Sequence, residues 1–193
     1  MKRAAVILRL NLLGLFVFVG ACPAFAADDI WAALKKPGHV ILLRHSNAPG
    51  NASESNDMNF KDCTIQRNLD DAGRAQATRI GNEFRKHGIS KLRLISSQYC
   101  RAIETAKLTK LGSVAEQRDL NQVFLSNPAS MVEAGTKGRA LIKAMAKGPL
   151  AMLVSHVTNI QAMASVQLDS GEFAVIHLDK AGEVVVDGKL AVP

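Results

Sequence analysis

The sequence predicts an α/β protein, a three-layer α/β/α sandwich built on a mostly parallel central sheet. Three short apolar runs rich in Val, Ile and Leu, "HVILL", "KLRLIS" and "LAMLVS", have the composition of strands buried on both faces. Longer segments with helical spacing separate these runs. Strands that alternate with helices favour parallel pairing, because the chain must cross back over the sheet after each strand.

The amino terminus has the layout of a secretory signal. Basic residues precede an apolar run over 12–21, which is followed by "CPAFAADD" with small residues at an A-x-A site. We expect cleavage after Ala26, so that 1–26 is a signal peptide and 27–193 is one domain of a periplasmic protein. The alternative is a lipoprotein anchored at Cys22, which follows the small residues of "VGAC". The apolar run is shorter than the roughly 18 residues of a stable membrane span.

The charge balance suits a small anionic ligand. The full chain has 24 Lys and Arg against 17 Asp and Glu, a formal net charge of +7. Removing the three basic residues of the signal leaves 21 against 17, a net charge of +4. No basic block with interleaved aromatic residues is present, so we expect no nucleic-acid partner. The sequence does not predict an oligomeric state.

Two cysteines remain after the signal, Cys63 and Cys100. In an exported chain such a pair favours a disulfide, and two buried free thiols are the alternative. The sequence has no C-x-x-C and no closely spaced His pair, so we expect neither a metal site nor a cofactor. Read singly, His39 is expected at a surface turn, and His177 in packing or at the surface of a terminal strand.

The elements follow in order along the chain. After the first strand, 46–66 is rich in Gly, Asn and Ser without any period, which indicates a functional loop over a site. A helix is predicted over 70–87, because Asp70 suits its start, Ala77, Ile80 and Phe84 share one face, and Gly88 suits its end.

The second half repeats this pattern. The second strand leads into a helix predicted to begin near Ser97, and a later helix has Pro128 in its first turn and ends at "GP". The tail "EFAVIHLDKAGEVVVDGKL" alternates apolar and polar residues, which predicts two strands around a turn. Before the first strand, Ile30 and Trp31 indicate an amphipathic segment that packs onto the domain.

All three apolar runs end in polar side chains that can bind an anion. The first leads into Arg44 and His45, the second into two serines and then Arg101, and the third into Ser155 and His156. The carboxyl ends of parallel strands converge on one crevice, to which a helix amino terminus near Ser97 would add N–H groups. Two arginines and two histidines with no neighbouring carboxylate favour a tetrahedral phosphate.

The segments "LLRHS", "SSQYCRAIETA" and "LVSHVTNI", with "RNLDDAGRAQA" between them, resemble the signatures of the histidine phosphatase superfamily, branch 1, with its phosphoglycerate-mutase-like fold. The resemblance implies a metal-independent phosphomonoester hydrolase of the histidine acid phosphatase type, acting on a small phosphate ester. It implies that His45 takes the phosphoryl group, that Arg44 and Arg101 hold its oxygens, and that His156 is the second pocket histidine.

The sequence departs from the family pattern at the proton donor. The Glu of an L-x-E segment is replaced by Gln122 in "DLNQVF", and an amide cannot donate the proton that a leaving group needs. Asp119 is the nearest candidate for a general acid. Asn51 stands where many members have a phosphate-contacting Asn, and we expect Arg67 to bind the substrate as well. The usual Gly after the nucleophile is Ser46.

The missing Glu leaves a second function open. The chain could be a catalytically degenerate phosphatase-fold protein that binds phosphorylated sugar or cell-envelope ligands. Retention of both arginines and both histidines in one chain favours the enzyme.

Overall fold

The computed structural model describes residues 27–55, 57–124 and 128–192, so the expected signal peptide lies outside the described residues. A six-stranded sheet has the strand order β3-β2-β4-β1-β5-β6. The first four strands in this order are parallel, and β5 and β6 add an antiparallel edge. The strands are β1 (Val40–Arg44), β2 (Arg93–Ser96), β3 (Val114–Glu116), β4 (Ala151–Ser155), β5 (Glu172–Leu178) and β6 (Val184–Ala191).

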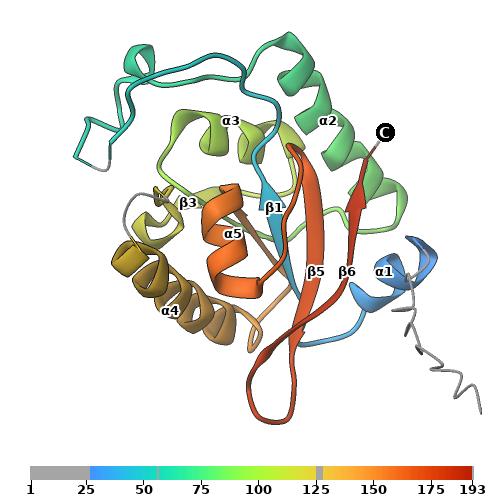
Figure 1. The fold of residues 1–193 in the computed structure, drawn as a ribbon. Coiled ribbons are helices and arrows are strands. Elements are labelled where there is room, and N and C mark those ends of the chain that lie inside the picture. The colour runs from blue at the N-terminus through green and yellow to red at the C-terminus, as the bar shows by residue number, and fades with distance from the viewer. Residues whose placement is uncertain (1–26, 56, 125–127, 193) are drawn as a thin grey trace, which may run out of the picture.

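Helices cover both faces of the sheet, which confirms the predicted three-layer sandwich (Figure 1). One face carries α1, α2 and α3, and the other carries α4 and α5. The helices are α1 (Ala27–Ala33), α2 (Asp71–Lys86), α3 (Cys100–Thr109), α4 (Pro128–Met145) and α5 (Val157–Ala164), with short 3₁₀ turns at η1 (Cys63–Ile65) and η2 (Arg118–Leu120).

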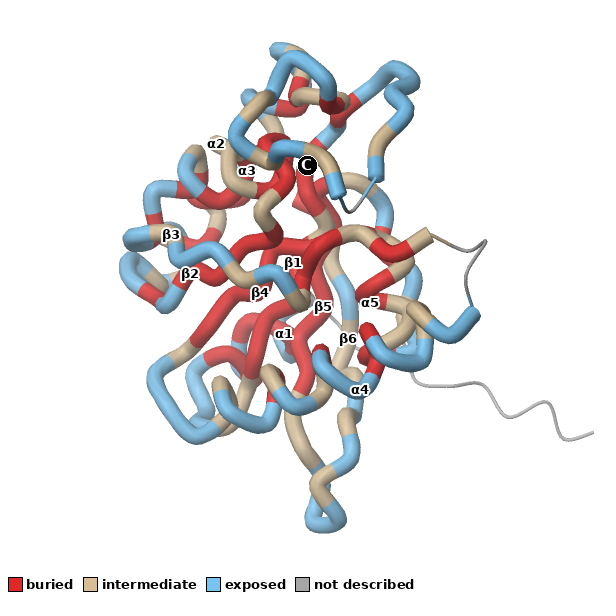
Figure 2. The backbone as a smooth tube through the Cα atoms, turned by 90° about the vertical axis from the view of Figure 1, so that its left-hand side faces the viewer, coloured by how far each residue is buried: buried red, intermediate tan, exposed pale blue. Residues whose placement is uncertain are grey.

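Two apolar cores lie on either side of β1. Ile41 and Leu43 pack into the core beneath α1, α2 and α3, whereas Val40 and Leu42 pack into the core beneath α4 and α5. Successive side chains of a strand point to opposite faces, so a strand covered on both faces needs a continuous apolar run. The strands β1, β4 and β5 accordingly form the buried centre of the molecule (Figure 2).

The ends of α2 follow the sequence prediction closely. The Asp70 side chain accepts a hydrogen bond from the Gly73 N–H at 2.7 Å, which caps the first turn. Beyond the helix, Gly88 adopts φ +83°, a left-handed conformation that favours glycine. The helix packs tightly on α3, since a Cβ on Gly81 would collide with the Thr109 carbonyl.

Helix α3 begins later than the sequence predicts. The helix expected near Ser97 begins at Cys100, because Ser97 still donates its N–H to Val154 of β4 and its Oγ accepts from the Tyr99 N–H. In α1, Trp31 is buried and stacks on His87 with ring centroids 4.0 Å apart, as expected for a packed segment.

In the described part of the chain, no helix has the length and apolar character to cross a bilayer.

Candidate active site

His45 lies at the carboxyl end of β1 with 3% of its surface exposed. Its Nδ1 is 2.8 Å from the Ser46 carbonyl oxygen, which can only accept, so Nδ1 carries the ring hydrogen. Nε2 therefore keeps its lone pair and accepts a hydrogen bond from Arg101 Nε at 3.2 Å. Burial, and secondarily Arg101, lower the pKa of His45 to about 3. The imidazole is thus held neutral, with the lone pair of Nε2 directed at the Arg101 guanidinium.

Arg101 comes from the first turn of α3 and is fully buried. Its Nη1 donates to Glu54 Oε1 at 2.6 Å, while Nη2 donates to Glu54 Oε2 at 3.0 Å and to Gln122 Oε1 at 2.6 Å. Burial lowers the pKa of Arg101, and the Glu54 carboxylate opposes that effect. The guanidinium therefore presents a planar fork already filled by carboxylate and amide oxygens.

His156 follows β4 and completes a buried polar chain. Arg101 Nη2 approaches His156 Nδ1 at 3.5 Å, and His156 Nε2 lies 2.8 Å from Ser97 Oγ. Ser97 Oγ lies in turn 3.3 Å from Asn121 Oδ1. Burial, followed by the neighbouring His45 and Arg101, lowers the pKa of His156. Its Nδ1 can thus accept a hydrogen bond in the same pocket.

Glu54 is a pocket residue that the sequence did not predict. Its side chain is 4% exposed, and Oε1 also accepts the Arg67 backbone N–H at 2.9 Å. The residue lies in the aperiodic loop after β1, which rises from the carboxyl end of the strand before returning to α2 (Figure 1). From the sequence, only the loop itself could be linked to a site. Glu54 could not be singled out, because its partner Arg101 lies in α3, far along the chain.

Two further arginines contribute charge to the pocket. Arg44 Nη1 donates to the Leu168 carbonyl at 2.9 Å, and its buried Nε has no hydrogen-bond partner among the described residues. Arg67 Nη1 donates to the Ala48 carbonyl at 2.9 Å. Both positive charges lower the pKa of His45, after burial and Arg101. The structure thus brings Arg44 and Arg67 into the electrostatic environment of His45.

The structure does not bring Asp119 or Asn51 into this cluster. The Asp119 carboxylate accepts a hydrogen bond from Gln117 at 2.9 Å and lies 4.0 Å from the Lys137 ammonium. The η2 turn therefore directs it toward α4. Asn51 is exposed on the loop and makes no hydrogen bond to the pocket among the described residues. The carboxylate that the loop brings to Arg101 is that of Glu54.

The Cys63–Cys100 disulfide predicted from the sequence is present, with a Cα–Cα distance of 5.8 Å. Cys100 immediately precedes Arg101 in α3, and Cys63 lies near the end of the loop that carries Glu54. The bond therefore fixes the returning end of the loop beside the buried guanidinium.

The pocket is closed in this structure, since both histidines and Arg101 are buried. A cavity of about 880 Å³ lies along the disulfide, but its lining includes none of His45, Arg101 and His156. The Glu54 carboxylate occupies the face of the Arg101 guanidinium that a phosphate group would use.

Residues 40–123 match the family described as the histidine phosphatase superfamily (branch 1). No curated protein matches the sequence significantly.

Solved structures of phosphatases share the fold. The protein histidine phosphatase SixA in complex with tungstate is 16% identical with a TM-score of 0.58, covering 79% of this chain and 96% of that chain. A phosphoserine phosphatase from Entamoeba histolytica is 14% identical with a TM-score of 0.59, covering 78% and 95%. A mycobacterial glucosyl-3-phosphoglycerate phosphatase is 16% identical with a TM-score of 0.57, covering 78% and 97%. At these identities the likeness shows a common fold.

Proposed function

We propose that this chain, which belongs to the histidine phosphatase superfamily (branch 1), is an exported, metal-independent phosphomonoesterase acting through a phosphohistidine on His45. The observation that carries the proposal is the neutral Nε2 of His45, held 3.2 Å from Nε of a buried arginine. A nucleophile and a fork for phosphate oxygens stand side by side in a site shielded from water.

The chemistry takes two displacements. Phosphate oxygens replace the Glu54 carboxylate on Arg101, and His45 Nε2 attacks phosphorus while the bond from phosphorus to the ester oxygen breaks. Water then attacks the phosphohistidine, which releases inorganic phosphate and returns the imidazole. Arg101, with Arg44 and Arg67, stabilises the negative charge on the equatorial oxygens in both steps.

Glu54 can supply the proton that the leaving alkoxide needs. A phosphate bound to Arg101 displaces the carboxylate from its counter-charge and leaves it beside another anion, where taking up a proton relieves the repulsion. The protonated side chain can then donate to the ester oxygen. Gln122 accepts a hydrogen bond from Arg101 at 2.6 Å and orients that guanidinium instead.

A second candidate function is a phosphate-binding protein without turnover. The observation that favours it is the closed pocket, in which a carboxylate already occupies the arginine fork and an amide stands where the family has its acid. Such a protein would bind phosphorylated sugar or cell-envelope ligands at the same residues.

Hydrolysis of p-nitrophenyl phosphate in excess chelator separates the two candidates. This ester has a good leaving group, so it needs little help from an acid. We expect turnover by the unaltered protein, a loss of more than about a thousandfold in His45→Ala, and an acid-labile, base-stable phosphoenzyme absent from that variant. His87→Ala removes a histidine outside the pocket and should retain activity. A folded protein that binds phosphate without turnover would favour the binding function, and full activity in His45→Ala would refute the proposed nucleophile.

Export to the periplasm is supported by the basic, apolar and A-x-A segments and by the disulfide. Fractionation of cells producing the full-length chain tests it: a soluble periplasmic form beginning at Ala27 is expected. A membrane-bound form with a lipid on Cys22 would favour the alternative anchor, and an intact leader in the cytoplasm would contradict export.

A further inference from the structure

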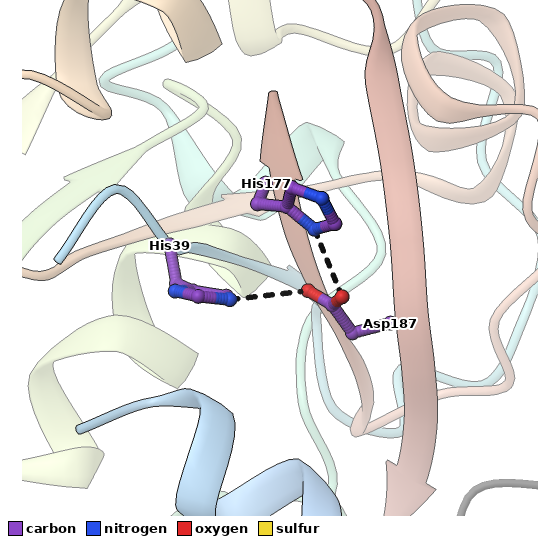
Figure 3. A group of neighbouring side chains, drawn as sticks. All are labelled: His39, His177 and Asp187. Atoms are coloured by element: carbon purple, nitrogen blue, oxygen red, sulfur yellow. Dashed lines mark ion pairs between the residues drawn. The ribbon is translucent and has the colours of Figure 1, made fainter. Parts of the chain in front are cut away.

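We propose that His39, His177 and Asp187 bind one Zn²⁺ ion at the end of the sheet opposite His45. Figure 3 shows the Asp187 carboxylate between the two imidazoles. His39 precedes β1 and His45 follows it, so the two sites lie roughly 20 Å apart along the strand direction. The inference is independent of the proposed catalytic function.

The sheet register brings these residues together. Val40 of β1 pairs with Ile176 of β5, so the preceding His39 comes opposite the following His177. Between β5 and β6, Val186 pairs with Ile176 while Gly188 pairs with Val175. Asp187 is therefore the extra residue of a β-bulge, an irregularity that re-aims a side chain. The bulge turns the carboxylate toward the histidine pair.

The donor atoms are spaced for a small ion. His177 Nδ1 lies 2.8 Å from Asp187 Oδ1, and His39 Nε2 lies 3.4 Å from Asp187 Oδ2. One ligand atom from each residue lies within 4.8 Å of the others. Zinc takes imidazole nitrogen and carboxylate oxygen at about 2.0–2.2 Å, which places tetrahedral ligands about 3.3 Å apart. Shifts on the order of 1 Å or less would gather the set around one ion.

The hydrogen bond on the far side of His39 sets its tautomer. Nδ1 lies 3.2 Å from the Lys36 carbonyl oxygen, so the ring hydrogen belongs on Nδ1 and Nε2 faces Asp187 with a lone pair. A lone pair directed at a carboxylate is repulsive unless a cation lies between them. An imidazole anchored through its other nitrogen is the usual arrangement of a metal-binding histidine.

Two buried atoms of the cluster lack a hydrogen-bond partner among the described residues, His177 Nδ1 and Asp187 Oδ2. The 2.8 Å approach of His177 to Asp187 is thus an ion-pair distance without hydrogen-bond geometry. A proton on His39 Nε2 would give Asp187 Oδ2 a hydrogen-bond donor, but His177 Nδ1 would still have no partner among the described residues. One divalent cation would satisfy both atoms and also the lone pair of His39, which favours a metal over a proton.

The surroundings leave the fourth ligand position to solvent. His39 and His177 line a cavity of about 460 Å³, together with Lys143 and Lys147 of the α4 end and the segment that follows it. Water can reach the ion through this cavity and complete a tetrahedral set of three protein ligands and one water. The ion would tie the start of β1 to both strands of the antiparallel edge.

Metal binding tests the inference directly. The protein expressed from the full-length sequence is stripped with chelator, dialysed and titrated with ZnCl₂ in a calorimeter. We expect one equivalent per chain and a rise in melting temperature on binding. His39→Ala, His177→Ala and Asp187→Asn should each weaken binding at least about tenfold.

Two histidines elsewhere provide matched controls. His87 lies 3.1 Å from the Glu83 carboxylate, and His45 stands beside His156 in the pocket. His87→Ala and His45→Ala should retain the same equivalent of zinc, because neither contributes to the cluster. Circular dichroism shows whether each variant is folded.

Absence of zinc uptake by the unaltered protein would overturn the inference. So would uptake that persists in His177→Ala and Asp187→Asn but disappears in His45→Ala, which would assign the ion to the phosphate pocket. If a variant does not fold, X-ray absorption at the zinc edge of the zinc-loaded His45→Ala variant identifies the ligands of the ion. Two imidazole ligands are expected there, and an all-oxygen or sulfur environment would contradict the site.

Discussion

Arg101 has a guanidinium with no access to solvent, and the Glu54 carboxylate of the loop balances its charge. An unpaired buried charge is costly, so Glu54 stabilises the closed pocket by meeting the fork with both oxygens. A phosphate dianion offers the same fork more oxygens and more charge. In the proposed mechanism, the residue that balances the buried charge of Arg101 is therefore the one that the phosphate ester displaces.

Glu54→Gln separates these two roles of the carboxylate. The amide keeps the shape but cannot carry charge or donate the proton, so inorganic phosphate should inhibit about tenfold more strongly, a difference typical of a charged hydrogen bond. Hydrolysis of an alkyl phosphate should fall about 10²–10⁴-fold, while p-nitrophenyl phosphate is affected far less. Steady-state kinetics with both esters and phosphate give the comparison.

Glu116→Gln is the matched control, because it makes the same change at an exposed carboxylate of β3. Equal losses on the alkyl and aryl esters in Glu54→Gln would exclude a proton donor and leave only the pocket-closing role.

The sequence could predict some pocket residues and not others for a physical reason. His45, Arg101 and His156 follow strands, and parallel strands of known direction bring their carboxyl ends together. Glu54 depends on the path of a loop without any period. Asp119 is close to the motif in sequence, but one 3₁₀ turn is enough to direct it to Lys137 instead.

At the level of elements, the disulfide joins the loop to α3 directly before Arg101. It closes a loop of about 38 residues, for which the chain-entropy estimate is about 4 kcal/mol of stabilisation. The Cys63→Ser, Cys100→Ser double variant should therefore lose about 2–4 kcal/mol in free energy of unfolding, measured with guanidinium chloride. A reductant should lower the stability of the unaltered protein toward that of the variant and leave the variant unchanged.

Two outcomes would contradict this role. Equal stability of the variant and the oxidised protein would mean that the loop is held by its other contacts, such as the hydrogen bond from the Cys100 N–H to Gln66 Oε1 at 3.0 Å. A reductant effect on the double variant would assign the change to something other than this bond.

Element boundaries were predictable where a single residue determines them. Asp70 and Gly88 delimit α2, and Pro128 begins α4. The start of α3 was not predictable from the sequence. Ser97 donates a strand-like hydrogen bond to Val154 of β4, which is distant in sequence, and the helix therefore begins later. The pairing of β5 with β1 was equally hidden, since an alternating strand does not specify its neighbour.

At the scale of the whole molecule, the two ends of β1 carry different chemistry. The carboxyl end gathers arginines and neutral histidines, and the amino end gathers a carboxylate between two histidines. The first was predictable from strand ends, whereas the second requires the register of three strands and a bulge. A sequence pattern shows which residues share one strand or helix. The three residues of the proposed zinc site come from different elements, so no single pattern contains them.

Neutral buried histidines make the stability of the whole fold depend on pH. Burial first, then Arg101, lower the pKa of His45 to about 3, from an unfolded value of 6.5. Above pH 6.5 the folded and unfolded chains both hold the neutral ring. Below it the unfolded chain binds a proton that the folded chain refuses until about pH 3, so acid favours unfolding.

The free energy of unfolding should therefore fall by up to about 1.4 kcal/mol per pH unit for each such histidine as the pH drops from 6 to 4. His156 acts in the same direction, because its pKa is also lowered by burial. Urea unfolding at pH 7.5, 5.5 and 4.5, in chelator to remove any bound metal, measures the slope. His45→Gln should reduce the slope, and His87→Ala, which removes a histidine outside the pocket, is the control. A free energy of unfolding that stays constant from pH 7.5 to 4.5 would show that the folded pocket takes up protons, and His45 would then lose its neutral nucleophile in acid.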